Sequence, residues 1–313
     1  MPNCRSVPKP SSDLGGGEIC IKVSPCSSKI INLAPQDAEL VALSAVDEHF
    51  RQVQRGSKNV RKNAPESSVS VISIKNCPPL CVKHFKYRGP VHALKGLFRA
   101  SHGLRALYQG SYLFEHGFTT SAPLALVRKS HINVTIEEWL IMAATPNSKE
   151  LDRYVVDCLG KGWPNENKQK FLRDSAQFLA AVHEASIFHT DLKTCNIMVS
   201  TQCSSGSINF SLLDYDDVKI CKNGLRLSMR AKNFSQIFLS TPAAINLDDR
   251  RFFLNQYLRS CKRSHIDKDR LIRMVLARIK GKSLLYVGPD GDISEKSPLE
   301  HETYEYCKRL GCE

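Results

Sequence analysis

The chain has 313 residues, with 44 Lys and Arg against 31 Asp and Glu, and a formal net charge of +13. Its 42% hydrophobic and 24% charged residues are ordinary for a soluble globular protein large enough to bury one large core or two modest ones. No apolar run approaches the length of a membrane span, and the first residues lack the order of a signal peptide, so we expect a cytoplasmic protein. The 12 cysteines are scattered singly, which favours reduced thiols over disulfides or a zinc site.

The first part of the chain predicts a disordered start followed by a helix and strands. Residues 1–30 contain Pro, Ser and three consecutive glycines, so we expect them to be mostly disordered. Apolar residues at helical spacing predict a helix over residues 35–53. Alternating residues over 68–74 and 80–85 predict two strands of an antiparallel sheet.

A basic region without any acid spans Ser67 to Phe114. It holds seven basic residues: Lys75, Lys83, Lys86, Arg88, Lys95, Arg99 and Arg105. Such a charge field favours an anionic partner, which includes a nucleotide, a nucleic acid, a phosphorylated glycolipid or an acidic membrane surface. A solvated basic face is the alternative interpretation.

The remaining elements predict a second, helical half. One or two helices are expected over residues 90–115, and Thr145–Ser148 has the composition of a linker. The clearest helix covers residues 167–185. Further strands are expected at 122–129 and 138–142, and further helices near 231–239, 248–260 and 267–280. We therefore divide the chain into a small N-lobe (31–144), a helical C-lobe (145–290) and a polar tail (291–313).

Two polar segments carry the chemistry, His189–Asn196 (His-Thr-Asp-Leu-Lys-Thr-Cys-Asn) and Ser211–Val218 (Ser-Leu-Leu-Asp-Tyr-Asp-Asp-Val). In the first segment an Asp can take a hydroxyl proton, a Lys can neutralise phosphate charge, and an Asn can ligate a metal. Short strands on either side of residues 203–207 predict a hairpin, which would bring Asn196 and Asp214 near each other.

These segments resemble the lipopolysaccharide kinase family of the protein-kinase-like superfamily, which phosphorylates Kdo or heptose in the lipopolysaccharide inner core. Residues 212–218 resemble the family's aspartate-rich metal loop, with Asp216 where protein kinases have glycine. The similarity continues through 113–123 and 230–237 and covers roughly residues 40–260. It implies an α+β, two-lobed protein-kinase-like fold with a small antiparallel-sheet N-lobe and a helical C-lobe.

The resemblance also implies roles for single residues. Asp191 would be the catalytic base or would orient the acceptor hydroxyl, and Lys193 would screen the γ-phosphate of ATP. Asn196 and Asp214 would hold Mg²⁺, while His189 would support the loop backbone. Asp216 and Asp217 would be either metal ligands or turn acids.

Nucleotide binding would involve the N-lobe. The strand lysine that contacts the α- and β-phosphates would be Lys83, with Lys86 as the alternative. Backbone groups from Met142 to Ala144 would receive the adenine.

Two departures from protein kinases stand out. The helix after Lys83 lacks the usual glutamate, since Glu115 is the only acid between Lys83 and Ile136 and lies at the helix end, with Gln109 as a possible neutral substitute. The glycine-rich phosphate loop is also absent.

The acceptor is expected to be anionic. The stretch 218–230 is short and basic, with Lys219, Lys222, Arg226 and Arg230, and no Ala-Pro-Glu segment follows it. Such a rim suits an acceptor that already carries phosphates or carboxylates. We expect ATP-dependent phosphorylation of a glycolipid or oligosaccharide by a protein peripheral to the cytoplasmic face of the inner membrane, with no nucleic-acid partner. A protein or small-molecule kinase, and a nucleotide-binding pseudokinase scaffold, are the alternatives.

Overall fold

The computed structural model describes residues 18–31, 35–87, 100–131, 134–145, 147–201, 207–242, 244–262, 265–282, 286–287 and 293–294. They belong to two compact units. The first unit comprises Met1–Pro146 together with Asp214–Asp216, and the second comprises Asn147–Leu213 together with Asp217–Glu313.

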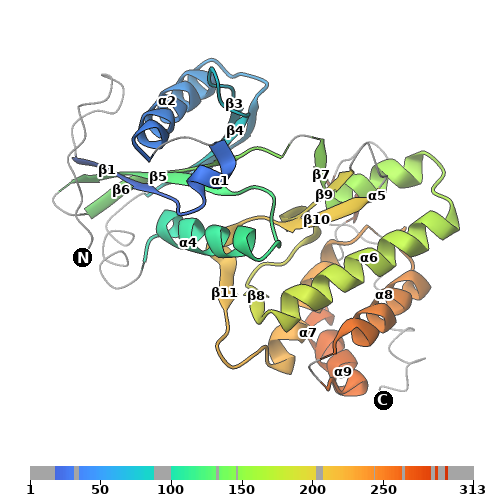
Figure 1. The fold of residues 1–313 in the computed structure, drawn as a ribbon. Coiled ribbons are helices and arrows are strands. Elements are labelled where there is room, and N and C mark those ends of the chain that lie inside the picture. The colour runs from blue at the N-terminus through green and yellow to red at the C-terminus, as the bar shows by residue number, and fades with distance from the viewer. Residues whose placement is uncertain are drawn as a thin grey trace. The chain divides into compact units, whose positions relative to one another are not determined.

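The first unit is built on a six-stranded antiparallel sheet in the order β1-β5-β6-β4-β3-β2, with helices α2 and α4 on opposite faces (Figure 1). The strands are β1 (Glu18–Val23), β2 (Val60–Asn63), β3 (Ser67–Ile72), β4 (Leu80–Lys86), β5 (Pro123–His131) and β6 (Val134–Ala143). The helices are α1 (Ser27–Ile31), α2 (Pro35–Gln54) and α4 (His102–Glu115).

Alternation along the strands assigns side chains to the two faces of this sheet. On β6, Trp139 packs in the core beneath α2, whereas the neighbouring Glu138 accepts a hydrogen bond from Gly103 N of α4 at 2.8 Å. Leu140, two residues after Glu138, pairs across the sheet with Lys83. Lys83 therefore lies on the face that α4 covers.

Aromatic and histidine side chains fill the core under α2. Trp139 is fully buried and stacks on His84 with 4.7 Å between ring centroids. His49 is also fully buried, with its ring nitrogens 2.7 Å from Ser70 Oγ and 3.0 Å from Ser68 Oγ. Burial lowers the pKa of His49 to about 4, so this core holds a neutral imidazole at pH 7.

The second unit combines small sheets with five longer helices among its described residues. The strands are β7 (Ser148–Glu150), β8 (Ile187–His189), β9 (Ile197–Thr201), β10 (Ile208–Leu212), β11 (Val218–Ile220), β12 (Tyr286–Val287) and β13 (Ile293–Ser294). The helices are α5 (Leu151–Gly160), α6 (Asn165–Glu184), α7 (Leu227–Ser240), α8 (Leu247–Ser260) and α9 (Lys268–Ile279), with short 3-10 helices η2 (Thr194–Asn196) and η3 (Tyr215–Asp217). Sheet pairing follows the orders β10-β9-β7, β11-β8 and β12-β13.

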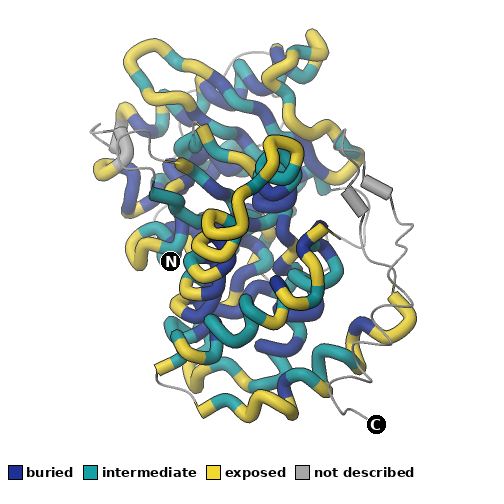
Figure 2. Tube along the Cα trace, turned by 90° about the vertical axis from the view of Figure 1, so that its right-hand side faces the viewer, coloured by how far each residue is buried: buried dark blue, intermediate teal, exposed yellow. Residues whose placement is uncertain are grey.

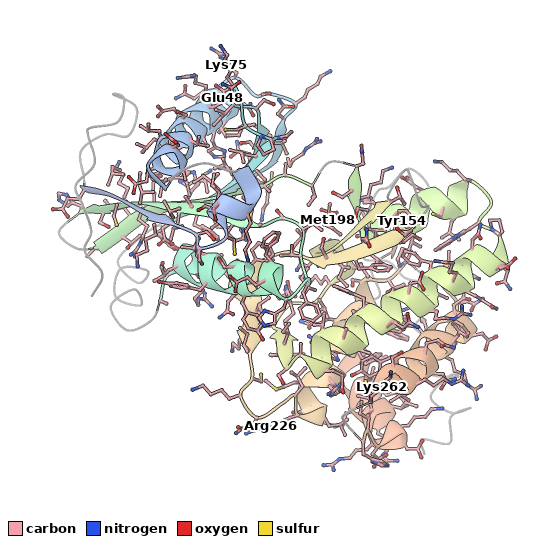
Figure 3. All side chains as sticks on the ribbon, in the orientation of Figure 1. Glu48, Lys75, Tyr154, Met198, Arg226 and Lys262 are labelled. Carbon is pink, nitrogen blue, oxygen red and sulfur yellow. The ribbon has the colours of Figure 1, made fainter. Side chains whose placement is uncertain are left out.

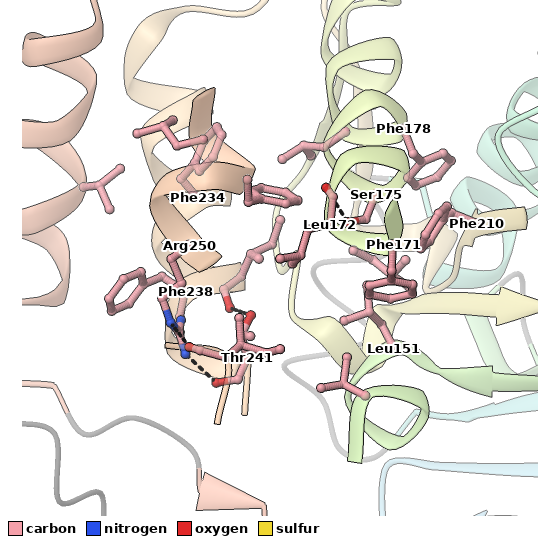
Figure 4. Close-up of a pocket in the computed structure, with 18 of the residues that line it drawn as sticks. Leu151, Phe171, Leu172, Ser175, Phe178, Phe210, Phe234, Phe238, Thr241 and Arg250 are labelled. Atoms are coloured by element: carbon pink, nitrogen blue, oxygen red, sulfur yellow. Dashed lines mark hydrogen bonds between the residues drawn. The ribbon is translucent and has the colours of Figure 1, made fainter. Parts of the chain in front are cut away.

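Helix α6 buries one face in the core of the second unit, and Figure 2 shows dark-blue buried segments alternating with exposed turns along such helices. Phe171 on this face contacts Trp163 edge-on, with ring centroids 5.2 Å apart. Apolar side chains of α5 to α9 surround a cavity of about 110 Å³ (Figure 4). Phe171, Phe210 and Phe234 are among its walls, so the cavity is apolar.

A buried polar network joins α6, α7 and α8. His183 Nδ1 lies 2.8 Å from Tyr257 Oη, and His183 Nε2 lies 3.2 Å from Asn233 Oδ1. Arg230 donates to Tyr257 Oη and to Glu184 Oε1. Burial, reinforced by the Arg230 charge, lowers the pKa of His183 to about 3, so this imidazole is neutral at pH 7.

Most long elements lie where the sequence pattern predicted them, including α2, α6, α8 and the strands β4 and β5. The expectation of disorder before residue 31 is wrong for Glu18–Val23, because Ile19, Ile21 and Val23 alternate and pair with β5. Strand β2 and helix α5 were not predicted, since β2 is polar and α5 is short. Residues 1–17, the helical prediction at 90–99, most of the 203–207 turn and nearly all of the tail lie outside the described residues.

The cysteine expectation holds for most of the described chain. Seven cysteines are free thiols: Cys26, Cys77, Cys81, Cys158, Cys195, Cys221 and Cys261. Cys20 is disulfide-bonded, which corrects the expectation at that position, because the spacing of cysteines in a sequence does not show which of them pair. Among the described residues, no helix is long and apolar enough to cross a membrane.

Candidate active site

The loop between β8 and β9 carries three of the predicted site residues. Lys193 Nζ lies 3.1 Å from Asp191 Oδ2, and Asn196 Nδ2 donates to the Asp191 carbonyl oxygen at 2.7 Å. Both charged side chains are well exposed, at 40% for Asp191 and 47% for Lys193. The loop therefore presents a carboxylate with an adjacent ammonium to solvent.

His189 supports the backbone of this loop, as predicted. It is fully buried, and its Nδ1 accepts from Asp191 N at 3.2 Å. Its Nε2 must then carry the proton, which it donates to the Leu213 carbonyl oxygen at 2.9 Å. Both ring nitrogens are used structurally, so His189 is not available as an acid or base.

Helix α7 fixes the loop through neutral side chains. Gln236 Oε1 accepts from Leu192 N at 3.1 Å, and its Nε2 donates to the Thr190 carbonyl oxygen at 2.8 Å and lies 3.5 Å from Asp191 Oδ1. Asn233 Nδ2 donates to the His189 carbonyl oxygen at 2.5 Å. The backbone on both sides of Asp191 is thus fixed without a second charge.

Two further contacts complete the support of the loop. Thr194 N donates to Ser240 Oγ at 2.8 Å, at the end of α7. Thr190 Oγ1 donates to Asp217 Oδ1 at 2.6 Å, so Asp217 is a structural acid that holds β11 beside β8.

Cys195 lies in the same loop but stays a thiol. Burial, followed by the charges of Asp152 and Glu150, raises the pKa of Cys195 to about 11. A thiol with so high a pKa is a poor nucleophile at pH 7, which argues against thiolate chemistry at this loop.

The β9–β10 hairpin confirms the predicted strand pairing. Ile197 faces Leu212 in the register, and Leu213 N donates to the Asn196 carbonyl oxygen at 2.9 Å. Asp214 follows Leu213 directly in the chain. Because Asn196 Nδ2 is committed to the Asp191 carbonyl oxygen, the Asn196 amide oxygen is the atom left for a metal, and an oxygen is the kind of ligand that Mg²⁺ prefers.

The Asp214–Asp216 segment is anchored in the first unit by Tyr215. Tyr215 is buried, and its hydroxyl lies 2.9 Å from Thr119 Oγ1 and donates to the Ser121 carbonyl oxygen at 2.6 Å. Its ring lies against Gly110 of α4, where a Cβ atom would come within 2.5 Å of it. Asp214 itself has φ of 53°, a left-handed conformation that Asp tolerates better than most residues.

Lys83 forms ion pairs with both carboxylates of this segment. Its Nζ contacts Asp214 Oδ1 and lies 3.1 Å from Asp216 Oδ1, and it also lies 4.8 Å from the Phe85 ring centroid. Burial opposes the charged form of Lys83, but Asp214 and Asp216 outweigh it and raise its pKa. Lys86 instead donates to Asn63 Oδ1 and the Ala64 carbonyl oxygen, which favours Lys83 over the alternative.

Helix α4 supplies basic groups to Asp216. His102 Nδ1 lies 2.8 Å from Asp216 Oδ2, and Arg105 Nη1 donates to the Asp216 carbonyl oxygen at 2.9 Å. Burial disfavours the Asp216 carboxylate, but hydrogen bonds and charges from His102 and Lys83 outweigh it and hold its pKa well below the usual range. Asp216 is therefore ionised at neutral pH.

The start of α4 is fixed to β6 by Glu138, which is fully buried. Ser101 caps the helix and donates to Glu138 Oε1, while Gly103 N donates to Glu138 Oε2. A Cβ atom on Gly103 would come within 2.6 Å of the Glu138 carboxylate, so this close approach requires glycine.

The segment expected to receive adenine lies at the end of β6. Met142 pairs with Cys81 of β4 and Pro123 of β5. Ala144 N donates to the Pro79 carbonyl oxygen at 2.9 Å, so this N–H is already used.

The sequence reasoning missed several residues around the site. His102, Arg105, Tyr215, Asn233 and Gln236 were not assigned roles, although Arg105 stood out in the acid-free region and Gln236 in the segment 230–237. Gln109 was expected to substitute for the helix glutamate, but its Oε1 is buried and has no hydrogen-bond partner in the described structure.

Arg230 was counted in the basic rim, yet it is buried in the α6–α8 network. The other rim cations, Lys219, Lys222 and Arg226, are exposed, and Figure 3 labels Arg226.

Comparisons with known proteins identify both family and fold. The lipopolysaccharide kinase (Kdo/WaaP) family matches residues 104–270. A solved structure described as WaaP in complex with acyl carrier protein is similar with a TM-score of 0.53 and 14% identity, and the match covers 83% of this chain and 95% of that one. No curated protein matches in sequence.

Two solved kinase domains of Mycobacterium tuberculosis PknI are also similar. The C20A mutant has a TM-score of 0.39 and 11% identity, over 81% of this chain and 94% of its own. The C20A_R136A double mutant has a TM-score of 0.37 and 12% identity, over 80% and 93%. The similarity to WaaP confirms the expected α+β, protein-kinase-like fold.

Proposed function

Because the chain belongs to the lipopolysaccharide kinase (Kdo/WaaP) family, we propose that it transfers the γ-phosphate of ATP to a Kdo or heptose hydroxyl of the lipopolysaccharide inner core. Family membership makes the chain a phosphotransferase that acts on a hydroxyl group. The sugar, the site residues and the membrane association are the parts that we propose.

One observation carries the proposal. The Asp191 carboxylate is exposed, has the Lys193 ammonium 3.1 Å away, and is held by backbone bonds to its neighbours rather than by a buried ion pair. In this geometry Asp191 accepts the proton of the acceptor hydroxyl, and Lys193 balances charge on the transferred phosphoryl group.

The nucleotide and metal roles follow from the other carboxylates. Asn196 and Asp214 would be the oxygen donors for a divalent metal, which would neutralise charge on the phosphates. Lys83 contacts the α- and β-phosphates. Met142 and Ala144 contact the adenine through carbonyl groups and the Met142 side chain, because the Ala144 N–H is already engaged.

The acceptor is proposed to be an anionic sugar. The exposed cations Lys219, Lys222 and Arg226 form a short positive rim on the second unit. A positive rim favours an oligosaccharide that already carries carboxylates or phosphates over a neutral alcohol. The same charge would hold the protein at the cytoplasmic face of the inner membrane, as a peripheral and salt-sensitive association.

An acceptor screen tests the function. Purified protein with Mg·ATP is given deacylated core oligosaccharide, a mixed protein substrate or small alcohols, and phosphate transfer is measured. We expect transfer to the oligosaccharide, with none in Asp191→Asn. Transfer to protein alone would indicate a protein kinase, and no Mg²⁺-dependent turnover with any acceptor would indicate a scaffold.

A second partner is suggested by the similar WaaP complex. The apolar cavity of about 110 Å³ in the second unit has room for a short stretch of an acyl chain. We propose that an acyl carrier protein loaded with a fatty acyl group binds this chain. Calorimetric titration should give tighter binding for the acylated carrier than for the unacylated one, and Val275→Trp, which fills the cavity, should abolish the difference. Equal affinity of both carriers for the unaltered protein would contradict this partner.

A further inference from the structure

The strand lysine lacks its usual partner from the neighbouring helix. In protein kinases a glutamate of that helix must pair with the lysine. Helix α4 has one acid, Glu115, in its last turn, and its carboxylate accepts from Cys26 Sγ at 3.7 Å. The carboxylates that pair with Lys83 come instead from the Asp214–Asp216 segment.

The two carboxylates are held differently. The Asp214 side chain is 40% exposed, and within the described chain its carboxylate pairs with Lys83. The Asp216 side chain is 10% exposed and has both carboxylate oxygens occupied, one by Lys83 and one by His102. Asp214 can therefore turn towards another cation, whereas Asp216 is fixed.

Basic side chains of α4 are what fix Asp216. Because a carboxylate only accepts hydrogen bonds, the proton between His102 and Asp216 must lie on His102 Nδ1. Arg105 binds the carbonyl oxygen of the same residue, so α4 contacts both its side chain and its backbone. The sign of the charges is reversed relative to a protein kinase, where an acidic helix residue holds a basic strand residue.

The position of α4 is itself fixed. Glu138 of β6 accepts from Ser101 Oγ and Gly103 N, the residues on either side of His102. A displacement of the helix start would therefore carry His102 away from Asp216.

We propose that Asp216 is the positioning carboxylate of Lys83, and that α4 acts on the nucleotide through His102 and Arg105, which hold Asp216. This rests on the proposed function, in which Lys83 contacts the nucleotide phosphates. When Asp214 binds another cation, Asp216 keeps the buried Lys83 ammonium paired and in place.

Binding measurements with a non-hydrolysable ATP analogue and Mg²⁺ test the inference without any sugar acceptor. Asp216→Asn and His102→Leu should each weaken binding about tenfold, the size of one charge-assisted hydrogen bond. His102→Asn should bind like wild type, because its amide nitrogen takes the place of Nδ1. His116→Leu is the matched control, since His116 is an exposed histidine at the opposite end of the same helix, where it stacks on Tyr112.

Steady-state kinetics separate positioning from general damage. KM for ATP should rise in Asp216→Asn and His102→Leu while kcat at saturating ATP and the melting temperature change little. The inference is overturned if Asp216→Asn binds the analogue like wild type, or if a folded His102→Asn is as weak as His102→Leu. If Asp216→Asn does not fold, the comparison of His102→Leu with His102→Asn tests the inference, because both variants leave the carboxylates intact. Failure of the wild-type protein to bind Mg·ATP would defeat the proposed function instead.

Discussion

The Asp214–Asp216 segment and the His189–Asn196 loop are held in place by different kinds of interaction. Besides the Tyr215 hydroxyl, the Asp214–Asp216 segment is held by basic side chains: Lys83, His102 and Arg105. The His189–Asn196 loop is held mainly by neutral amides and hydroxyls, chiefly Gln236 and Ser240, and by one carboxylate, Asp217, at Thr190.

The difference fits the roles that we propose for the two loops. In the proposed function the Asp214–Asp216 segment binds a metal ion and must stay ionised, and His102 and Lys83 hold the pKa of Asp216 well below its usual range against the cost of burial. In the same proposal Asp191 accepts a proton, and the amides of Gln236 and Asn233 fix the backbone on both sides of it without a charge of their own. Within the acid-free region, Lys83 and Arg105 bind the Asp214–Asp216 segment, whereas Lys75 is exposed (Figure 3).

Substitution of the two aspartates should break the comparison most strongly. Asp191→Asn is expected to lower turnover by roughly 10²- to 10⁴-fold while Mg·ATP still binds. Asp214→Asn should lose Mg²⁺-dependent nucleotide binding along with turnover, and Asn tolerates the left-handed backbone at this position. Nucleotide titration with and without Mg²⁺, beside a turnover assay, separates the two. Wild-type turnover in Asp191→Asn would refute the mechanism.

The support of the Asp214–Asp216 segment by basic side chains should be weakened most by substitution of Lys83. Lys83→Met leaves Asp214 and Asp216 without their ammonium partner and should lower kcat/KM for ATP by about 100-fold, the effect of two charge-assisted bonds. Lys86→Met is the matched control on the same strand, because Lys86 contacts Asn63 and Ala64 instead. A dead Lys86→Met beside an active Lys83→Met would move the phosphate lysine to residue 86.

The neutral support of the His189–Asn196 loop should be weakened most by substitution of Gln236. Gln236→Leu removes the bonds to Leu192 N and the Thr190 carbonyl oxygen and should lower kcat about tenfold, with unchanged affinity for Mg·ATP. Ser235→Ala, which removes a bond within α7 only, should leave kcat unchanged. If Gln236→Leu weakened nucleotide binding as strongly as turnover, the two supports would not be separable.

Stability should respond to pH through the buried histidines of both units. The pKa values of His183 and His49 are lowered to about 3 and 4, so between pH 6.5 and these values the unfolded chain binds more protons than the folded one. Stability should therefore fall as pH drops below 6.5, by roughly 1 kcal/mol per pH unit for each histidine. Chemical unfolding at pH 7.5 and 5.5 measures this. A constant free energy of unfolding over that range would show that the two imidazoles do protonate in the folded protein.

The parts of the site that sequence could predict depend on local spacing. Asp191, Lys193 and Asn196 lie within one loop, and the alternation of β4 assigned Lys83 to the same face as Cys81. The hairpin turn signal likewise predicted the β9–β10 pairing. Such features need no knowledge of distant residues.

The missed parts depend on contacts between distant residues. His102 and Asp216 are 114 positions apart, and Gln236 lies 44 positions from Leu192. A lone His or Gln on a helix has no pattern that separates a support from a surface residue. The prediction that Arg230 lies in the basic rim was wrong for the same reason, because its burial depends on Glu184 and Tyr257 in other helices.

The two tryptophans give each unit its own optical reporter. Trp139 is buried against His84 in the first unit, and Trp163 lies against Phe171 in the second, and the chain has no others. In Trp163→Phe the intrinsic fluorescence would come from the sheet that carries Lys83. In Trp139→Phe it would come from the helical unit that carries Asp191. Denaturation of the two variants would then show whether the two units melt together or one after the other.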